Sequence, residues 1–371
     1  MNVAKIREEL FPITKSVTFL DIANHSPPCI PVQEAIRGYL LDWDRLDRRG
    51  DMRTAETVAL WAKLVGCDPD EACSQPNTSS GLATVAEALR FGPGDNAVVN
   101  DLENPANWYP WTAQRVRGAE LRVVKGRGGA VRLEDLERAV DDHTKAVAIS
   151  HVEWLTGARH DLKAIADLAH EHGAKLVVDG IQAAGALKVD VKRDGVDFYA
   201  NGAYKWLLGC SGAGFLYVSK ENVAELDPVQ WGYRAVEEHD IEEPRLMATA
   251  KKFELGEPSY ISTIGTKAAI EMIMGLGPTN IEARVVKLGQ RLYDGLTHLG
   301  LRVVSPSERR MRSGTITITT KDTKATFDRL RNEDFYLSLR DAGIRISVDF
   351  YNTEEEVDRL LDSLAGETKA V

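Results

Sequence analysis

Three short apolar runs in close succession constrain the fold of this chain more than any other feature of its sequence. They lie at residues 175–179, 196–200 and 214–219, and the third is entered through a glycine-rich turn. Such runs predict strands that are buried on both faces of a sheet. Asp179 ends the first run and Lys205 follows the second. Both side chains are therefore expected in the crevice where open α/β sheets bind ligands.

Asp179 and Lys205 are the pair of groups that the chemistry of pyridoxal phosphate requires. A lysine holds the aldehyde of this cofactor as a Schiff base, and a carboxylate that pairs with the pyridine nitrogen keeps the ring an electron sink. Apolar or cationic surroundings lower the pKa of such a lysine and make its amine nucleophilic. One aspartate and one lysine are also compatible with two surface residues. Their place at the ends of apolar strands favours a cofactor site, because a buried charge needs a partner.

Around these two residues the sequence resembles the class V aminotransferase superfamily, whose members are fold type I enzymes that depend on pyridoxal phosphate. Cysteine desulfurases, kynureninases and isopenicillin N epimerase-like enzymes belong to it. The resemblance rests on DGIQAAG, which begins at Asp179, and on AYKWLLGCSGAGFLYV, which contains Lys205, and it covers nearly the whole chain. It implies Lys205 as the Schiff-base lysine and Asp179 as the pyridine partner. It also implies Gln182 near the phenolic oxygen of the cofactor and Tyr204 as a phosphate ligand.

The resemblance implies the α/β architecture of a fold type I PLP-dependent transferase. This architecture combines a large domain, with a mostly parallel sheet flanked by helices, and a smaller α+β C-terminal domain. Residues 16–261 are expected to form the large cofactor-binding domain, and residues 1–15 and 262–371 the small one. A length of 371 residues with 43% hydrophobic content suits one large domain plus a smaller one.

Net charge, hydropathy and cysteine content indicate which partners, metal sites and cellular compartment are expected for this chain. A net charge of −10 disfavours binding to nucleic acid or to an anionic membrane surface. No apolar stretch approaches the roughly 18 residues of a membrane span, and the N-terminal segment lacks the apolar core of a signal peptide. The four cysteines show no C-x-x-C pair and no metal-ligand spacing, so no metal site is predicted. A cytoplasmic protein with reduced thiols is expected.

A polar cluster, Asn77-Thr78-Ser79-Ser80, precedes a predicted helix that starts near Gly81. Such residues cap helix N-termini by ordinary rules. A helix N-terminus also offers unpaired N–H groups and the positive end of a dipole, which bind phosphate. In the family that this chain resembles, the same position holds the cofactor phosphate, which implies Thr78 and Ser79 as phosphate ligands.

Two residues depart from the family pattern where the cofactor ring is expected. In DLENPANWYPW, Asn104 aligns with the residue whose side chain stacks on the pyridine ring, and asparagine does not stack as histidine or an aromatic residue does. Trp154 falls where the family often has an asparagine that bonds the cofactor's oxygen. Both are predicted cofactor-site residues, and Trp154 or Trp108 is a candidate to cover the ring. Glu153, next to Trp154, is expected to be solvated.

The segment KKFELGEPSYIST matches the one that, in this family, reaches the cofactor phosphate of a neighbouring subunit. The usual Gly-Thr is replaced by Gly256-Glu257, and a carboxylate repels phosphate. Ser259 or a backbone N–H group is therefore expected to make the contact, unless Glu257 turns away. The expectation of a homodimer follows from the same resemblance.

The C-terminal motifs point to residues for the substrate. Arg-Ile-Ser followed by YNTEEEVD matches the family's last strand and helix, which implies that Arg345 binds the substrate α-carboxylate. A guanidinium fork suits a carboxylate bidentately. Arg340, in the preceding turn, is expected to contact a substrate side chain. The proline-rich loop ANHSPPCIP places Asn24 and His25 near the substrate, and the long loop PVQWGYRAVEEHD contributes Tyr233 to the pocket wall.

The chain departs from cysteine desulfurases near its C-terminus. Those enzymes carry a nucleophilic cysteine on a loop before the C-terminal arginine. Here Arg340-Asp341-Ala342-Gly343 joins the two predicted strands, and no cysteine follows Cys210. Formation of a persulfide by that route is therefore not expected, and Cys210 is interpreted as structural.

These features predict a homodimeric enzyme that acts on an α-amino acid, with Lys205 removing the Cα proton as general base. The carbanion has three fates: transamination, loss of a β-substituent, or epimerisation. The C-terminal pattern is closest to aminotransferase and isopenicillin N epimerase-like members. One alternative is a C–S or C–C lyase without the loop cysteine. Another is a non-catalytic fold type I protein that serves as a binding or regulatory subunit.

Overall fold

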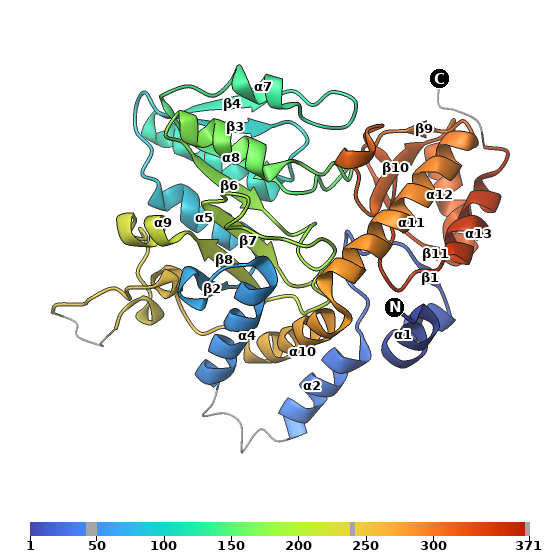
Figure 1. The fold of residues 1–371 in the computed structure, drawn as a ribbon, viewed down its shortest axis with the longest axis horizontal. Coiled ribbons are helices and arrows are strands. Elements are labelled where there is room, and N and C mark those ends of the chain that lie inside the picture. Colours follow the sequence, from blue (N-terminus) through green and yellow to red (C-terminus); the bar gives the residue numbers. More distant parts are fainter. Residues whose placement is uncertain (42–49, 238–241, 368–371) are drawn as a thin grey trace.

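A sheet of seven strands forms the centre of the larger of two domains (Figure 1). The computed structural model describes residues 1–41, 50–237 and 242–367. The strand order is β2-β8-β7-β6-β5-β3-β4. The bounds are β2 (Ala72–Gln75), β3 (Asn96–Asn100), β4 (Glu120–Val124), β5 (Thr144–Ser150), β6 (Lys175–Asp179), β7 (Phe198–Gly202) and β8 (Gly214–Val218).

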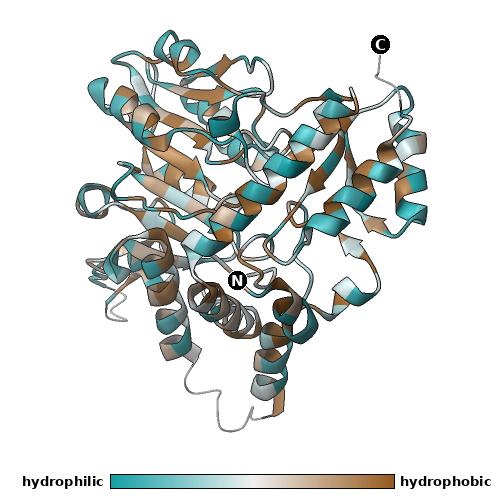
Figure 2. Cartoon of the chain, turned by 45° about the vertical axis from the view of Figure 1, so that its right-hand side comes forward, coloured by the Kyte–Doolittle hydropathy of each residue, from teal (hydrophilic) through white to brown (hydrophobic). Residues whose placement is uncertain are grey.

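Five neighbouring strands of this sheet run parallel, from β7 through β6, β5 and β3 to β4. Strand β8 is antiparallel to both β7 and β2. All residues of β3, β7 and β8 are buried, as expected for strands covered on both faces. Figure 2 shows these central strands as largely hydrophobic and the outer faces of the helices as hydrophilic. The mostly parallel sheet flanked by helices is the predicted architecture.

Helices cover both faces of the large sheet. They are α4 (Gly50–Val65), α5 (Thr78–Ala88), α6 (Tyr109–Ala113), α7 (Leu133–Glu137), α8 (Leu162–Glu171) and α9 (Lys220–Glu225). Helix α10 (Tyr260–Leu276) packs on α4 and on α2 (Ile30–Leu41). The first helix, α1 (Val3–Leu10), lies near the small domain, where Arg7 pairs with Glu356.

A four-stranded antiparallel sheet forms the small domain, in the order β12-β13-β10-β9. Its strands are β9 (Arg302–Val303), β10 (Thr315–Thr319), β12 (Ser338–Arg340) and β13 (Gly343–Ser347). Its helices are α11 (Pro278–His298), α12 (Thr323–Asn332) and α13 (Glu354–Leu364). In Figure 1, α11 runs from the end of α10 across to this sheet. The predicted smaller α+β domain is therefore present.

The first strand of the chain joins the small domain. Strand β1 (Thr18–Phe19) pairs in parallel with β11 (Phe335–Tyr336), and Asp21 bridges to Ser347. The predicted boundary at residues 261/262 falls inside α10, which packs on large-domain helices. We therefore propose a later boundary, at the α10–α11 junction. Within the described ranges, no helix is long and apolar enough to cross a bilayer.

The N-terminus of α13 carries a testable contribution to stability. The Thr353 side chain accepts a hydrogen bond from the Glu356 N–H, and the Glu356 side chain accepts one from the Thr353 N–H. Such a capping box satisfies two backbone donors. We expect Thr353→Ala to destabilise the small domain by about 1 kcal/mol, seen as a lower urea midpoint. Thr353→Ser keeps the hydroxyl and should match the wild type; equal midpoints for all three proteins would contradict the role of the cap.

Candidate active site

A cavity of about 130 Å³ opens at the carboxyl ends of β5, β6 and β7. Eight of the predicted cofactor-site residues line it: Thr78, Ser79, Asn104, Trp154, Asp179, Gln182, Tyr204 and Lys205. Four further lining residues had no predicted role in the cofactor site: Asn77, Ala106, Ser150 and Ile181. Ser150 ends β5 and Ile181 lies two residues beyond the end of β6, and that position at strand ends is the sequence signal that marks them.

Asp179 ends β6 and is 3% exposed. One carboxylate oxygen accepts a hydrogen bond from the Ile181 N–H at 2.9 Å. Burial raises the pKa of Asp179 to about 6, and the Ile181 N–H and the charge of Lys205 oppose that rise. A buried carboxylate at this position is suited to pair with a cationic group of a ligand.

Lys205 follows β7 and reaches the same cavity. Burial, together with the charges of Arg345 and Arg340, lowers its pKa to about 8 against the opposing effect of Asp179. The ammonium group lies over the ring of Tyr204, 5.7 Å from its centroid. A lysine with this pKa holds a substantial neutral fraction near neutral pH, which nucleophilic attack on an aldehyde requires.

The N-terminus of α5 forms another part of the cavity wall, with Asn77, Thr78 and Ser79 among the lining residues. Asn77 caps the helix by accepting a hydrogen bond from the Ser80 N–H at 2.9 Å. The Thr78 hydroxyl is buried and has no hydrogen-bond partner. A Cβ atom at Gly202 would lie 3.1 Å from this hydroxyl and 3.2 Å from Ile181, so glycine keeps the space open. An N-terminal helix turn with a spare hydroxyl fits a phosphate group.

Gln182 is held rigidly at the side of the cavity. Its side-chain oxygen accepts a hydrogen bond from the Trp206 indole N–H at 2.7 Å, and its amide donates to the Ala23 carbonyl at 2.9 Å. One amide hydrogen is left to face the cavity that Gln182 lines. This arrangement supports the predicted place near an oxygen of the cofactor, which stays a prediction.

Arg345 is 1% exposed, and two of its nitrogens, Nε and Nη2, have no hydrogen-bond partner. Its Nη1 donates to the Trp154 carbonyl at 2.9 Å, and Nη2 lies 3.6 Å from the Asp21 carboxylate. Burial lowers the pKa of Arg345 to about 10. A buried guanidinium with unused donors is suited to an anionic ligand. Asp21, which our sequence analysis missed, is recognisable as a carboxylate that follows an apolar strand.

Arg340 and Asn24 lie together at the rim. The Arg340 guanidinium donates to the Asn24 side chain at 2.8 Å. Asn24 and His25 are exposed, and the ring of His25 lies 5.5 Å from that of Tyr204. The structure therefore brings these predicted substrate residues to the mouth of the cavity, within electrostatic reach of Lys205 in the case of Arg340.

Tyr233 and Ser259 do not line the cavity within this chain. The Tyr233 hydroxyl donates to Glu257, which also accepts from Tyr260. The Ser259 hydroxyl caps α10 and bonds Ser262 at 2.8 Å. Ser259 is predicted to contact the cofactor phosphate of a second subunit, and Tyr233 to contribute to the wall of the substrate pocket. Both contacts remain proposals.

The aromatic cover of the cavity differs from the usual pattern. Asn104 lines the cavity, but its side chain accepts a hydrogen bond from the Ala106 N–H at 3.0 Å and caps the short helix that follows. Trp154 also lines the cavity, and its indole N–H is buried without a partner. Trp108 does not line it and packs near α5 instead. Of the two candidates to cover a ligand ring, Trp154 is the one in place.

Glu153 corrects an expectation from sequence. It was expected to be solvated, but it is fully buried, with both carboxylate oxygens unpartnered. Its nearest cationic candidate is the ring nitrogen of His160 at 3.9 Å. Burial and the nearby Glu103 raise the pKa of Glu153 well above its usual range. A protonated Glu153 follows, because an unpaired buried carboxylate is costly.

The residues present fit pyridoxal phosphate. The buried hydroxyl and N–H groups at the start of α5 fit its phosphate, Lys205 its aldehyde, and Asp179 its pyridine nitrogen. Among the described residues, no group of three or more histidine, cysteine, aspartate or glutamate side chains is placed to hold a metal ion.

Comparisons with known proteins agree with this geometry. The family described as Aminotransferase class-V matches residues 52–331. A probable cysteine desulfurase of Methanothermobacter thermautotrophicus is 30% identical over 99% of each chain, and the uncharacterized aminotransferase YcbU of Bacillus subtilis is 29% identical over 97% of each. The apo structure of a cysteine desulfurase from Thermococcus onnurineus superposes with a TM-score of 0.89 and 26% identity, over 98% of this chain and 97% of that one.

A second solved structure shares the fold at lower identity. The complex between the cystine C-S lyase C-DES and its product cysteine persulfide superposes with a TM-score of 0.88. It is 23% identical and covers 96% of this chain and all of that chain.

The lowered pKa of Lys205 gives a pH dependence. Because the neutral amine attacks the aldehyde, uptake of pyridoxal phosphate by the apoprotein should rise with pH through a midpoint near 8. An ordinary lysine has its pKa at 10.5. Replacing the nearby cation in Arg345→Gln should raise the midpoint, since less positive charge then opposes protonation. Stopped-flow absorbance across about pH 6 to about pH 11.5, a range that includes the ordinary lysine pKa, measures it, and a midpoint near 10.5 would contradict the assignment.

Proposed function

The chain belongs to the class V aminotransferase family of pyridoxal phosphate-dependent enzymes, and from this we propose that it removes the Cα proton of an α-amino acid and expels a β-substituent, as a C–S lyase. The observation that carries the first step is the shared cavity of Lys205 and Asp179. The elimination step is supported by the relatives named as desulfurases.

The bound cofactor supplies the electron sink for the bond that breaks at the substrate Cα. Arg345 holds the substrate α-carboxylate through its two unused nitrogens, Nε and Nη2. Lys205 would take the Cα proton of the substrate as general base, and its pKa near 8 suits this transfer at neutral pH. Asp179 would pair with the pyridine nitrogen of the cofactor, and Trp154 would help to keep water out of the cavity that it lines.

The fate of the β-substituent differs from that in a desulfurase with an acceptor cysteine. A two-residue turn, Asp341-Ala342, joins β12 to β13, and the chain has no cysteine after Cys210. Burial raises the pKa of Cys29 to about 11 and of Cys67 to about 12, so both are protonated thiols. The Cβ–S bond would then break with its electron pair on sulfur, and the sulfur product would leave as hydrogen sulfide from cysteine or as cysteine persulfide from cystine, whose S–S bond is already oxidised.

The alternatives to elimination differ in how well the site supports them. Epimerisation by two bases needs a proton donor opposite Lys205, and the side chains of Asn104 and Trp154 on the cavity wall do not serve as acids at neutral pH. Transamination remains the second candidate, because YcbU, named an aminotransferase, matches this chain over 97% of its length. The retained Lys205, Asp179 and Arg345 disfavour a non-catalytic role.

The assay that tests this proposal supplies one amino acid at a time, with and without a 2-oxo acid acceptor. Elimination releases ammonia, a 2-oxo acid and the sulfur product without the acceptor, whereas transamination stalls after one turnover unless the acceptor is present. We expect cystine or cysteine to give acceptor-independent turnover. Lys205→Ala should lose at least about a thousandfold in rate, and the exposed Lys220→Ala should not.

Two results would contradict the elimination. One is turnover that depends strictly on the 2-oxo acid, which would identify an aminotransferase. The other is a persulfide on one of the protein's own cysteines during turnover, detected by mass spectrometry, which would restore an acceptor-thiol route.

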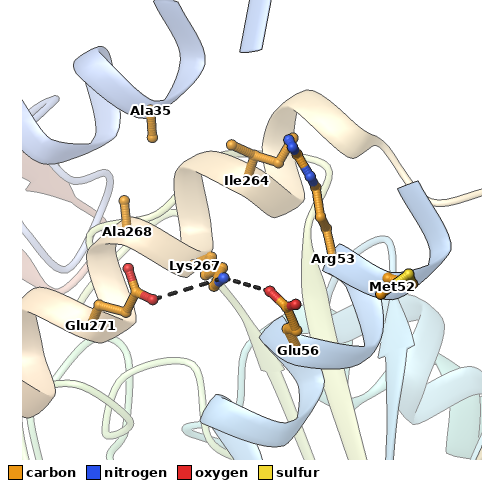
Figure 3. A pocket seen from close by; sticks show the side chains of 8 residues that line it. All are labelled: Ala35, Met52, Arg53, Glu56, Ile264, Lys267, Ala268 and Glu271. Atoms are coloured by element: carbon orange, nitrogen blue, oxygen red, sulfur yellow. Dashed lines mark hydrogen bonds and ion pairs between the residues drawn. The ribbon is translucent and has the colours of Figure 1, made fainter. Parts of the chain in front are cut away.

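We further propose a homodimer with its interface at α2, α4 and α10. Figure 3 shows the groove between these helices, with Ile264 and Met52 along it and Lys267 placed between Glu56 and Glu271. Large apolar side chains on the same helices are exposed, among them Leu40, Leu41, Met52 and Ile261. A second copy of the chain would remove this surface from water. The segment with Ser259 directly precedes α10. It therefore adjoins the proposed interface, from which it would reach the cofactor site of the partner.

The dimer is tested by light scattering coupled to gel filtration. Met52 is 63% exposed, and Met52→Glu should shift the mass toward the monomer because it buries a charge in the interface. Val116 is 93% exposed on a different element, and Val116→Glu serves as the matched control. A monomeric wild type would overturn the proposal.

A further inference from the structure

A second cavity, of about 480 Å³, lies between the two domains and is larger than the catalytic one. Its walls come from α7, from the first turn of α8, and from the small-domain 3₁₀ helix η8 (Arg309–Met311). Its apolar lining includes Leu136 and Leu162 of the large domain and Met311 of the small domain. A cavity of this size accommodates a small organic molecule.

One hairpin, residues 151–160, connects this cavity to the catalytic one. Val152 and Arg159 form a bridge, and the His160 N–H donates to the His151 carbonyl at 3.0 Å. Of these residues at the base of the hairpin, His151, Arg159 and His160 line the second cavity, and Val152 does not. The hairpin is also tied to η8, because the Arg159 N–H donates to the Met311 carbonyl at 2.8 Å.

The tip of the same hairpin belongs to the catalytic cavity. Trp154 lines that cavity, and its carbonyl accepts the hydrogen bond from Arg345. A second hydrogen bond joins the tip to the small domain, because the Ser313 hydroxyl donates to the Gly157 carbonyl at 2.8 Å. A shift at the base of this short hairpin therefore displaces Trp154, whose carbonyl positions Arg345.

The charges of the second cavity favour an anion on the side that faces the small domain. Arg132 of the large domain and Arg310 of the small domain both pair with one carboxylate, Glu308. One of the two guanidinium charges is left without a carboxylate of its own. Arg159 and Arg193 have separate acidic partners, Glu282 at 2.7 Å for Arg159 and Asp194 at 2.7 Å for Arg193.

The acidic side chains on the walls do not cancel this excess. Asp161 accepts the Ala164 N–H at 3.2 Å and caps α8, and Asp194 is engaged by Arg193. Glu134 is exposed to solvent, where its charge is screened. The first turn of α8, which also lines the cavity, adds the positive end of a helix dipole.

We propose that this cavity is a regulatory site for a small organic anion, a carboxylate or phosphate attached to an apolar group. The anion lies between Arg132 and Arg310, and the apolar group packs on Leu136, Leu162 and Met311. Occupancy fixes η8 against the base of the 151–160 hairpin and so changes the setting of Trp154 and Arg345. This site goes beyond the proposed lyase activity and stands whichever amino acid the enzyme uses.

Calorimetric titration of the holoenzyme with phenyl phosphate tests the site, because bound cofactor then fills the phosphate cradle at α5. Phenyl phosphate should bind saturably, and more tightly than inorganic phosphate or benzyl alcohol. Arg310→Gln leaves Arg132 and Glu308 balanced and should weaken binding about fivefold, whereas Glu308→Gln frees a second guanidinium and should tighten it about threefold. Arg309→Gln, next in the chain but outside the cavity, should leave binding unchanged.

Coupling to the catalytic cavity has its own readout. The absorption band of the bound cofactor should change during the same titration, with the Kd found by calorimetry. Absence of saturable binding at millimolar phenyl phosphate, or equal affinity in Arg310→Gln and Arg309→Gln, would overturn the site. Equal binding of inorganic phosphate would overturn the apolar half of the assignment. Binding without any spectral change would overturn the coupling.

Discussion

The structure depends on a small set of charges that are buried at the carboxyl ends of parallel strands. Asp179 and Lys205 lie in the same cavity, where burial raises the pKa of the first to about 6 and lowers that of the second to about 8. Each is costly alone, and together with a bound cofactor they satisfy one another. Asp179 ends β6 and Lys205 follows β7, so two paired strands of the sheet hold this pair in place.

The small domain completes the site by contributing a buried guanidinium. Arg345 lies in β13, whose neighbour β12 carries Arg340, so one antiparallel ladder presents both cations to the large domain. The connection runs through Trp154, whose carbonyl binds Arg345 and whose ring lines the cavity. Contacts between the domains thus hold Arg345 at a fixed place relative to Trp154 and the cavity that Lys205 lines, and in the proposed function this arrangement would position the substrate carboxylate.

Much of this could be predicted from the sequence. The run at 175–179 coincides with β6, and the run expected at 196–200 is β7, displaced by two residues because the strand continues through Asn201 and Gly202. Eight predicted cofactor-site residues line one cavity. The failed expectation at Glu153 has a tertiary cause. From sequence, Glu153 is a polar loop residue and is expected to be solvated, and only the packing of the hairpin against both domains buries it completely.

The sequence by itself determined the family, the cofactor, the mostly parallel sheet and the Asp179–Lys205 pair, because each depends on local motifs and on periods of apolar residues. Tertiary structure alone decided that Asp21 lies beside Arg345, that Trp154 rather than Trp108 lines the cavity, and that Arg132 and Arg310 share Glu308. Each of these pairs two segments that are distant in the chain, and no local pattern encodes which distant side chains meet when two domains pack.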